Sequence, residues 1–166
     1  VMDSDIIMAG PILEHLGEHT EDFIVQREDP SPEFVRSHAF DLDALSRLDP
    51  DFQFPNYTFN TGQWVGTSGI FSRADFDEWV LWHEPPRLRH PGVFQMGEQG
   101  LLNYFLQRQV QNGRCSLKRL RFMEVGDETR VAGIDLARVR TGDGYPFLIH
   151  WCGLRRDSFE HMHRGD

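Results

Sequence analysis

The apolar segments of this chain are short, and glycine and proline interrupt them. The longest one, Ile6 to Leu13, contains both Gly10 and Pro11. It is far shorter than the ~20 apolar residues that cross a bilayer. Short apolar segments between turn residues are typical of strands and short helices in a globular protein. We therefore expect a fold of short strands, loops and a few helices, without a membrane span.

The composition indicates a folded domain of ordinary size. The chain has 166 residues, of which 39% are hydrophobic, and it contains 13 Phe and 4 Trp. A domain typically has roughly 100–200 residues, which is enough to bury a core. Disorder, a collagen-like helix and a coiled coil are excluded, and a single domain is predicted.

The charge balance is acidic. Lys and Arg number 17 and Asp and Glu 26, so the formal net charge is 17 − 26 = −9. No run of five or more basic residues occurs, and binding to nucleic acid or to an anionic membrane would oppose the net field of the protein. We therefore expect no nucleic-acid partner.

Two cysteines, Cys115 and Cys152, are 37 positions apart and form no Cys-x-x-Cys motif. This usage indicates neither a disulfide framework nor a zinc cluster. It favours a reducing compartment such as the cytoplasm, although the sequence leaves the compartment open.

Turn residues and apolar spacing divide the chain into strands and helices that alternate, which is typical of an α/β fold. Ser72 and Asp75, spaced as in a capping box, predict a helix from Ser72 to His83. Apolar residues three to five positions apart predict a helix from Glu98 to Val110 that packs on a sheet. The Asp- and Pro-rich region 28–55 is predicted to be irregular, apart from a helical turn at Leu42–Leu48. Strands are expected at Ile6–Met8, Phe23–Val25, Trp64–Gly66, Leu120–Val125 and Phe147–Trp151.

Asp3-Ser4-Asp5 is the first candidate for chemistry. In an extended segment, alternate side chains lie on the same face, so the two carboxylates can converge on one cation. Two hard oxygen donors suit Mg²⁺ or Mn²⁺, and a bound cation can hold phosphate oxygens. Such a triplet is also common in solvated turns after strands, and by itself it does not decide between a metal site and a turn.

His150 is the second candidate. It lies in an apolar strand, where a lone histidine is more often a hydrogen-bonded core residue than a metal ligand. Imidazole beside carboxylates, however, suits Mn²⁺. His161 and His163 lie in the polar C-terminal region, and residues 156–166 are expected to form a flexible tail.

Asn60-Thr61-Gly62 is a candidate for binding sugar hydroxyls. The amide of Asn60 offers a donor and an acceptor, and Gly62 can adopt a positive φ. An ordinary Asx turn leading into a strand explains the same residues. Tryptophan rings such as Trp64 can stack on sugars, although Trp79 and Trp82 are spaced like buried residues of a helix.

These motifs follow one another in a defined order. Asp-x-Asp is followed by Phe59-Asn-Thr-Gly leading into Trp-Val-Gly, then by Glu98-Gln-Gly at a helix start, and then by an apolar strand ending in His150-Trp-Cys-Gly. This order resembles that of GT-A-type glycosyltransferases, in particular the glycogenin and galactosyltransferase-like group. The resemblance runs from Asp3 to about Arg155 and implies the C-terminal part of a GT-A fold, with a mixed sheet flanked by helices.

The resemblance implies how a nucleotide sugar would bind. Asp3 and Asp5 would hold Mn²⁺ or Mg²⁺ with the diphosphate of the donor, a UDP-sugar in the first instance, and His150 would complete the metal site. Further donor or acceptor contacts would come from Asn60, Thr61, Gly62, Trp64, Gly153 and Arg155.

The resemblance also implies catalytic roles for Glu98 and Gln99. Either residue would act at the anomeric centre or on the hydroxyl of a sugar or glycan acceptor. Glu98 as a base would favour inversion of the anomeric configuration, whereas a stabilising Gln99 would favour retention, and the sequence does not choose.

The chain departs from the family pattern in three places. Gly100 stands where the family usually has a second acid, and Arg155 and Arg156 only approximate the basic residue that contacts the diphosphate. The family also has a nucleotide-binding half before Asp-x-Asp, so the sequence is expected to be an N-terminally truncated domain with weak or no activity alone.

The expected activity is transfer of a sugar from a nucleotide diphosphate to a hydroxyl acceptor, with the cation stabilising the leaving diphosphate. Two other functions stay open. A nucleotidyl transferase or phosphohydrolase would use the same cation, and a non-catalytic carbohydrate-binding fragment would hold a sugar with its aromatic residues.

Overall fold

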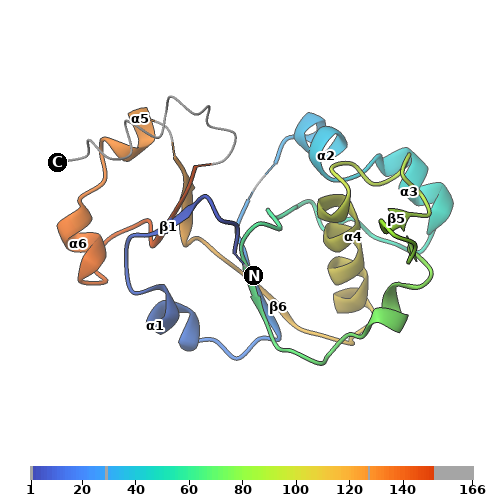
Figure 1. Ribbon diagram of the computed structural model, residues 1–166, viewed down its shortest axis with the longest axis horizontal. Helices are drawn as coiled ribbons and strands as arrows, with labels where there is room; N and C mark the ends of the chain where they lie inside the picture. The colour runs from blue at the N-terminus through green and yellow to red at the C-terminus, as the bar shows by residue number, and fades with distance from the viewer. Residues whose placement is uncertain (1, 29, 127, 152–166) are drawn as a thin grey trace. The chain divides into compact units, whose positions relative to one another are not determined.

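The computed structural model describes residues 2–28, 30–126 and 128–151, and these residues form two compact units. Unit 1 consists of residues 20–120. Unit 2 combines residues 2–19 with the described residues from 121 onward, so unit 1 is inserted in the sequence of unit 2 (Figure 1). Each unit contains a small mixed sheet and helices, as expected of the α/β class.

The sheet of unit 1 has β2 (Phe23–Gln26) at its centre. This strand pairs antiparallel with β3 (Trp64–Gly66) and parallel with β6 (Leu117–Leu120). All four residues of β2 are buried, because both edges and both faces of the strand are covered. The strands predicted from the apolar segments at 23–25 and 64–66 are therefore confirmed.

Helix α4 (Glu98–Gln111) is the longest helix of unit 1 and contributes to two hydrophobic clusters. Leu101 and Tyr104 pack in the first, whose other members are Val35, Ala39, Phe40, Leu45, Val80 and Phe94. Phe105 and Leu106 pack in the second, with Phe23, Val25, Phe59 and Cys115. The prediction of a helix at 98–110 that packs on a sheet is confirmed, because the second cluster includes β2.

Four amide side chains occupy every fourth position of α4, and we call them the amide row: Gln99, Asn103, Gln107 and Gln111. Each donates a hydrogen bond from its side-chain nitrogen to a backbone carbonyl, of His38, Phe59, Tyr57 and Gln53 respectively. Asn103 and Gln111 also accept from the backbone N–H groups of Phe59 and Gln53. Segment 53–59 has no regular secondary structure, so Asn103, Gln107 and Gln111 satisfy backbone groups that a neighbouring strand would otherwise bind.

Two helices lie in the region predicted to be irregular. Helix α3 (Leu42–Leu48) matches the helical turn expected there, but α2 (Pro32–His38) was not predicted. Its start follows a known pattern: the Ser31 hydroxyl accepts from the backbone N–H of Phe34 at 3.2 Å, and proline occupies the first turn. The prolines therefore begin this helix and do not prevent it.

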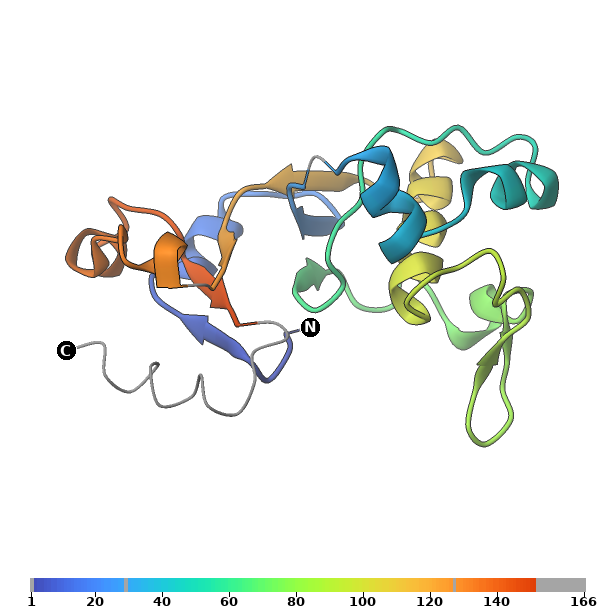
Figure 2. The same cartoon turned by 90° about the horizontal axis from the view of Figure 1, so that it is seen from above.

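The predicted helix from Ser72 to His83 is wrong. The carboxylate of Asp75 does accept from the backbone N–H of Ser72 at 2.8 Å, as in a capping box, but only one 3₁₀ turn, η1 (Arg73–Phe76), follows. This hydrogen bond and the Arg114 guanidinium lower the pKa of Asp75 to about 2. The chain then forms a hairpin of β4 (Val80–Leu81) and β5 (Arg87–Leu88), visible in yellow-green in Figure 2. Pairing between these strands overrides the helical spacing of the sequence.

Unit 2 has β8 (Leu148–His150) at the centre of its sheet. It pairs antiparallel with β1 (Ile6–Met8) and parallel with β7 (Met123–Val125), and all its residues are buried. The single strand predicted at 120–125 is divided, because β6 ends at Leu120 and β7 begins at Met123. The helices of unit 2 are α1 (Ile12–Gly17), α5 (Glu128–Val131) and α6 (Leu136–Arg140).

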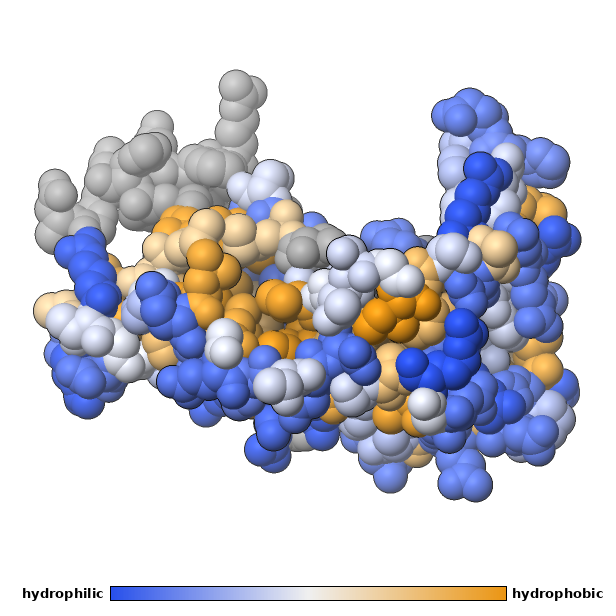
Figure 3. Space-filling view, turned by 90° about the horizontal axis from the view of Figure 1, so that it is seen from below, coloured by the Kyte–Doolittle hydropathy of each residue, from blue (hydrophilic) through white to orange (hydrophobic). Residues whose placement is uncertain are grey.

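In the part of the chain that the structure describes, no helix combines the length and apolar character needed to cross a bilayer, and the longest, α4, has 14 residues. Some large apolar side chains of unit 2 are nevertheless exposed, such as Met8 at 60% and Leu13 at 75%. Figure 3 shows apolar surface, in orange, between hydrophilic regions. Scattered apolar residues are common on protein surfaces and do not by themselves mark a site.

Candidate functional site

Strand pairing in unit 2 brings the acidic triplet next to His150. Ile6 of β1 is opposite His150 of β8, and the backbone N–H of Trp151 donates to the carbonyl of Asp5 at 3.0 Å. The Asp5 Oδ1 atom lies 3.2 Å from His150 Nε2, and Asp3 Oδ2 lies 3.9 Å from the same nitrogen. The three residues predicted to bind metal therefore form one cluster.

The triplet has a different local structure from the one expected. Ser4 and Asp5 form a turn that leads into β1, so the alternation of an extended strand does not place the two carboxylates. The turn brings Asp3 back toward the end of β8, where His150 lies. The convergence of Asp3 and Asp5 thus depends on the turn and on the β1–β8 pairing.

The cluster is buried on one side and open on the other. The His150 side chain is 4% exposed, whereas the side chains of Asp3 and Asp5 are 52% and 39% exposed. The Nδ1 atom of His150 is buried and has no hydrogen-bond partner among the described residues. Two partly exposed carboxylates thus face solvent beside a buried imidazole.

This arrangement fits a divalent cation. One ligand atom from each of Asp3, Asp5 and His150 can be chosen so that all three lie within 4.8 Å of one another. A cation with bonds of about 2.1 Å holds neighbouring ligand atoms about 3–4 Å apart, so small rotations of the exposed carboxylates would complete the site. Two carboxylates and one imidazole form a donor set that several divalent metal ions accept.

Asn60 and Gly62 form an Asx turn in unit 1, in which the Asn60 Oδ1 atom accepts from the backbone N–H of Gly62 at 2.7 Å. Positive φ angles occur at other glycines and not at Gly62. The turn interpretation of this segment is therefore confirmed. Thr61 is half-buried within it, and the turn uses one of the two lone pairs of the Asn60 Oδ1 atom.

Trp64 lines a cavity of about 330 Å³, which we call the Trp64 cavity. Thr67 and Ser68, which carry hydroxyl groups, are among its lining residues, and the others are Phe23, Gly66, Gly69, Phe71, Phe76, Leu102 and Leu106. A Cβ atom at Gly66 would lie 2.6 Å from the Phe23 ring and 2.7 Å from the Trp64 ring. Glycine therefore allows both rings to pack here, and an aromatic wall beside two hydroxyls suits a sugar ring.

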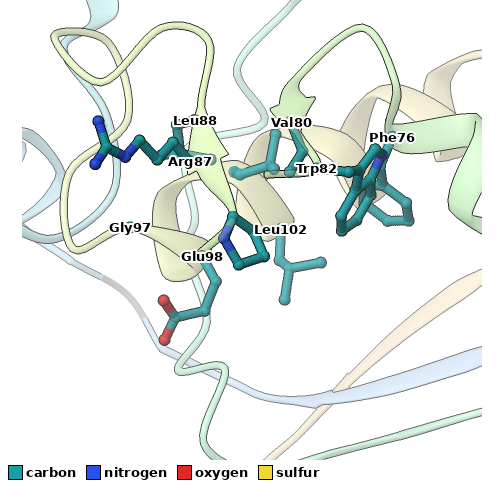
Figure 4. A pocket seen from close by; sticks show the side chains of 10 residues that line it. Phe76, Val80, Trp82, Arg87, Leu88, Gly97, Glu98 and Leu102 are labelled. Carbon is teal, nitrogen blue, oxygen red and sulfur yellow. The ribbon is translucent and has the colours of Figure 1, made fainter. Parts of the chain in front are cut away.

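Glu98 lines a second cavity of about 410 Å³, the Trp82 cavity, which shares Phe76 and Leu102 with the first (Figure 4). Trp82 itself is 38% exposed. The expectation that Trp82 is a core residue is thus wrong, because the helix that would have buried it does not form. Trp79, in contrast, packs against Tyr104 in the first hydrophobic cluster.

Glu98 and Gln99 occupy different environments at the start of α4. Glu98 is exposed, whereas the Gln99 side-chain nitrogen donates to the carbonyl of His38 at 2.9 Å as part of the amide row. Gln99 therefore has a structural contact that accounts for its side chain. Glu98 is the better candidate for a group that meets a substrate.

Gly100, which the sequence resemblance aligns with a second acid, lies against another backbone segment. A Cβ atom at this position would be 2.1 Å from the carbonyl oxygen of Ala39 and 2.7 Å from that of Gln95. The backbone N–H of Gln95 donates to the same Ala39 carbonyl at 2.7 Å. Only glycine fits this packing, so position 100 cannot hold a carboxylate.

We expect Gly100→Ala to lower the free energy of unfolding by about 1–3 kcal/mol, because the new methyl group must displace the Ala39 backbone. Urea denaturation of both proteins measures the change. Gly17→Ala is the matched control, since a Cβ atom at this helical glycine would meet nothing within 4 Å. Equal stability of the Gly100→Ala and wild-type proteins would contradict the packing described for Gly100.

One buried polar residue of this region was missed. Gln63 is 1% exposed, and neither atom of its side-chain amide has a hydrogen-bond partner among the described residues. Its position directly after the Asn60–Gly62 turn is the signal that could have identified it. Buried amides usually have hydrogen-bond partners. The amide of Gln63, which has no such partner in the described part of the chain, is therefore a further polar group that could hydrogen-bond a ligand near this turn.

The candidate residues are divided between the units. The metal candidates belong to unit 2, and Asn60, Thr61, Gly62, Trp64, Glu98 and Gln99 belong to unit 1. Gly153, Arg155 and the predicted tail at 156–166 lie outside the described residues, as do Cys152, Arg156, His161 and His163. Comparison with protein-family models, with curated proteins and with solved structures finds no match to the chain.

Proposed function

We propose that this protein is a metal-dependent glycosyltransferase that moves a sugar from a nucleotide-diphosphate donor to a hydroxyl acceptor. The observation that carries the proposal is the cluster of Asp3, Asp5 and His150, whose ligand atoms lie within 4.8 Å of one another. The order of the motifs along the sequence supports the finer assignment to the C-terminal part of a GT-A fold. A UDP-sugar and Mn²⁺ or Mg²⁺ are the proposed donor and cation.

The metal site would act on the leaving group. A bound divalent cation supplies Lewis-acid stabilisation of the negative charge that develops on the departing diphosphate. Asp3 and Asp5 would provide negative charge to hold the cation, and buried His150 would supply the third ligand. Because both carboxylates reach solvent, a diphosphate can approach the open side of the cluster.

Residues of unit 1 carry groups that suit a sugar or an acceptor. The Trp64 cavity combines an aromatic ring with the hydroxyl groups of Thr67 and Ser68, and these groups suit stacking and hydrogen bonding to a sugar. Glu98 would accept the proton of the acceptor hydroxyl. Since Gln99 is bound to the His38 carbonyl, a base at Glu98 is favoured over a stabilising Gln99, which favours inversion of the anomeric configuration.

A panel of nucleotide sugars tests the proposed function. With Mn²⁺ and a mixture of hydroxyl acceptors, we expect at least one UDP-sugar to yield UDP and a glycosylated product in small amounts, detected by mass spectrometry, because only weak activity is expected of this chain alone. Chelation of the cation should abolish both products, because the leaving diphosphate would lose its stabilisation. Release of pyrophosphate or of a nucleoside monophosphate would contradict the proposal and favour a nucleotidyl transferase or phosphohydrolase.

A further inference from the structure

The Trp82 cavity has an almost entirely apolar wall. Arg87 and Glu98 are its charged residues, and the others are Phe76, Val80, Trp82, Pro86, Leu88, Gly97, Leu101 and Leu102. The indole N–H of Trp82 already donates to Asp77 Oδ1 at 2.6 Å. The wall therefore leaves two side chains, Arg87 and Glu98, to hydrogen-bond a ligand.

Trp82 is held in place although it is partly exposed. In addition to the hydrogen bond to Asp77, the guanidinium carbon of Arg73 lies 4.7 Å from the centre of the Trp82 ring, a cation–π contact. The side chain thus loses little rotational freedom when a ligand binds. Such preorganisation strengthens binding because less entropy is lost.

The charged groups lie at the margin of the cavity. In Figure 4 the carboxylate of Glu98 and the guanidinium of Arg87 point away from Val80, Trp82 and Leu102. Glu98 comes from the start of α4 and Arg87 from β5. A ligand that fills the cavity would meet apolar side chains along its body, and rotation of the exposed Glu98 side chain, which lines the cavity, would bring its carboxylate to the ligand.

These features select the chemistry of the ligand. A free sugar carries several hydroxyl groups that each need a partner, and burying them against an apolar wall is costly. The Trp64 cavity, with the hydroxyls of Thr67 and Ser68, suits a sugar better. A volume of about 410 Å³ lies within the range of small-molecule sites and accommodates one or two fused rings.

We propose that the Trp82 cavity binds the acceptor and that this acceptor is a phenol or another aryl alcohol. Its ring packs against Trp82, Phe76 and Leu102, and its hydroxyl donates a hydrogen bond to the carboxylate of Glu98. This inference rests on the proposed function and narrows the acceptor from a sugar or glycan to an aromatic alcohol.

Calorimetric titration of the full chain with 2-naphthol and with glucose tests the cavity without metal or donor. We expect 2-naphthol to bind about 10- to 100-fold more tightly than glucose, because burial of its rings removes apolar surface from water. Trp82→Ala should weaken 2-naphthol binding at least about tenfold, because it removes most of the aromatic wall. Equal affinity for the two compounds, or unchanged binding by Trp82→Ala, would overturn the proposal.

Two further variants separate binding from folding. Leu102→Trp fills the cavity and should also abolish 2-naphthol binding, whereas Leu42→Ala removes a side chain that is 40% exposed in the same unit and should change nothing. Glu98→Ala should weaken 2-naphthol about tenfold but leave the binding of naphthalene, which has no hydroxyl, unchanged. Equal losses for both compounds would exclude the proposed hydrogen bond.

The titration tests the aryl acceptor and the donor panel tests the glycosyltransferase, so either proposal can be contradicted without the other. Binding of 2-naphthol without any transfer in the donor panel would uphold the cavity assignment and contradict the glycosyltransferase. Transfer to sugars by a protein that does not bind 2-naphthol would uphold the glycosyltransferase and contradict the aryl acceptor.

Discussion

Replacing Asp5 by asparagine is expected to weaken Mn²⁺ binding by at least about 100-fold, since loss of a direct charged ligand should exceed the 10- to 100-fold effect of changes around a metal site. The substitution keeps the shape of the side chain but removes the negative charge that lies 3.2 Å from His150 Nε2. The Asp5 side chain is 39% exposed, so the fold should tolerate the change. Titration of the protein with Mn²⁺, followed by electron paramagnetic resonance of the free ion, measures the affinity.

Glu14→Gln provides the control for this experiment. Glu14 is an exposed carboxylate on α1 in the same unit, and its replacement removes the same charge at a distance from the cluster. We expect wild-type affinity from Glu14→Gln and loss of affinity from Asp5→Asn. Equal affinities in all three proteins would mean that the contacts of His150 with Asp3 and Asp5 form an ordinary ion pair and not a metal site.

Replacing Asn103 by leucine is expected to lower the free energy of unfolding by about 2–5 kcal/mol. Asn103 is fully buried, and its side chain accepts from Phe59 N and donates to Phe59 O, both at 2.8 Å. Leucine has a similar size but leaves these two backbone groups without the partner they have now, at a cost of about 1–3 kcal/mol each. Urea denaturation monitored by tryptophan fluorescence gives the change.

The control lies on the same helix. Gln109 is half-buried, and its side-chain oxygen accepts only an exposed bond, from Arg114 at 3.2 Å, so Gln109→Leu should change stability by no more than about 0.5 kcal/mol. If Asn103→Leu were as stable as Gln109→Leu, Asn103 would not anchor segment 53–59 as described.

The parts of the fold that were predicted correctly have strong local signals. The apolar spacing of 98–110 identifies α4 because both sides of this helix are buried, and the apolar segment 23–25 identifies β2. The region 72–83 has an equally regular pattern, but strand pairing between Val80 and Leu88 decides its structure. The spacing of residues 72–83 does not report that Val80 and Leu81 pair with a strand that begins at Arg87.

Sequence order identified the three members of the candidate metal cluster, but it could not show how they meet. That depends on the register in which Ile6 faces His150, which is set by tertiary packing. For Gln99 the sequence and the structure indicate different roles. The resemblance predicted catalysis, but the side chain donates to the His38 carbonyl. A short motif reports residue type, whereas the neighbours of each side chain decide what it can do.

The amide row also fixes the rotation of α4 about its own axis. Successive residues of an α-helix differ by 100° in direction, so a turn of the helix by one residue would separate all four amides from their backbone partners at once. Glu98 directly precedes Gln99, the first member of the row, so the same constraint sets the position of Glu98 in the lining of the Trp82 cavity. Neutral amides do not change charge with pH, so this alignment should hold under acidic and alkaline conditions alike.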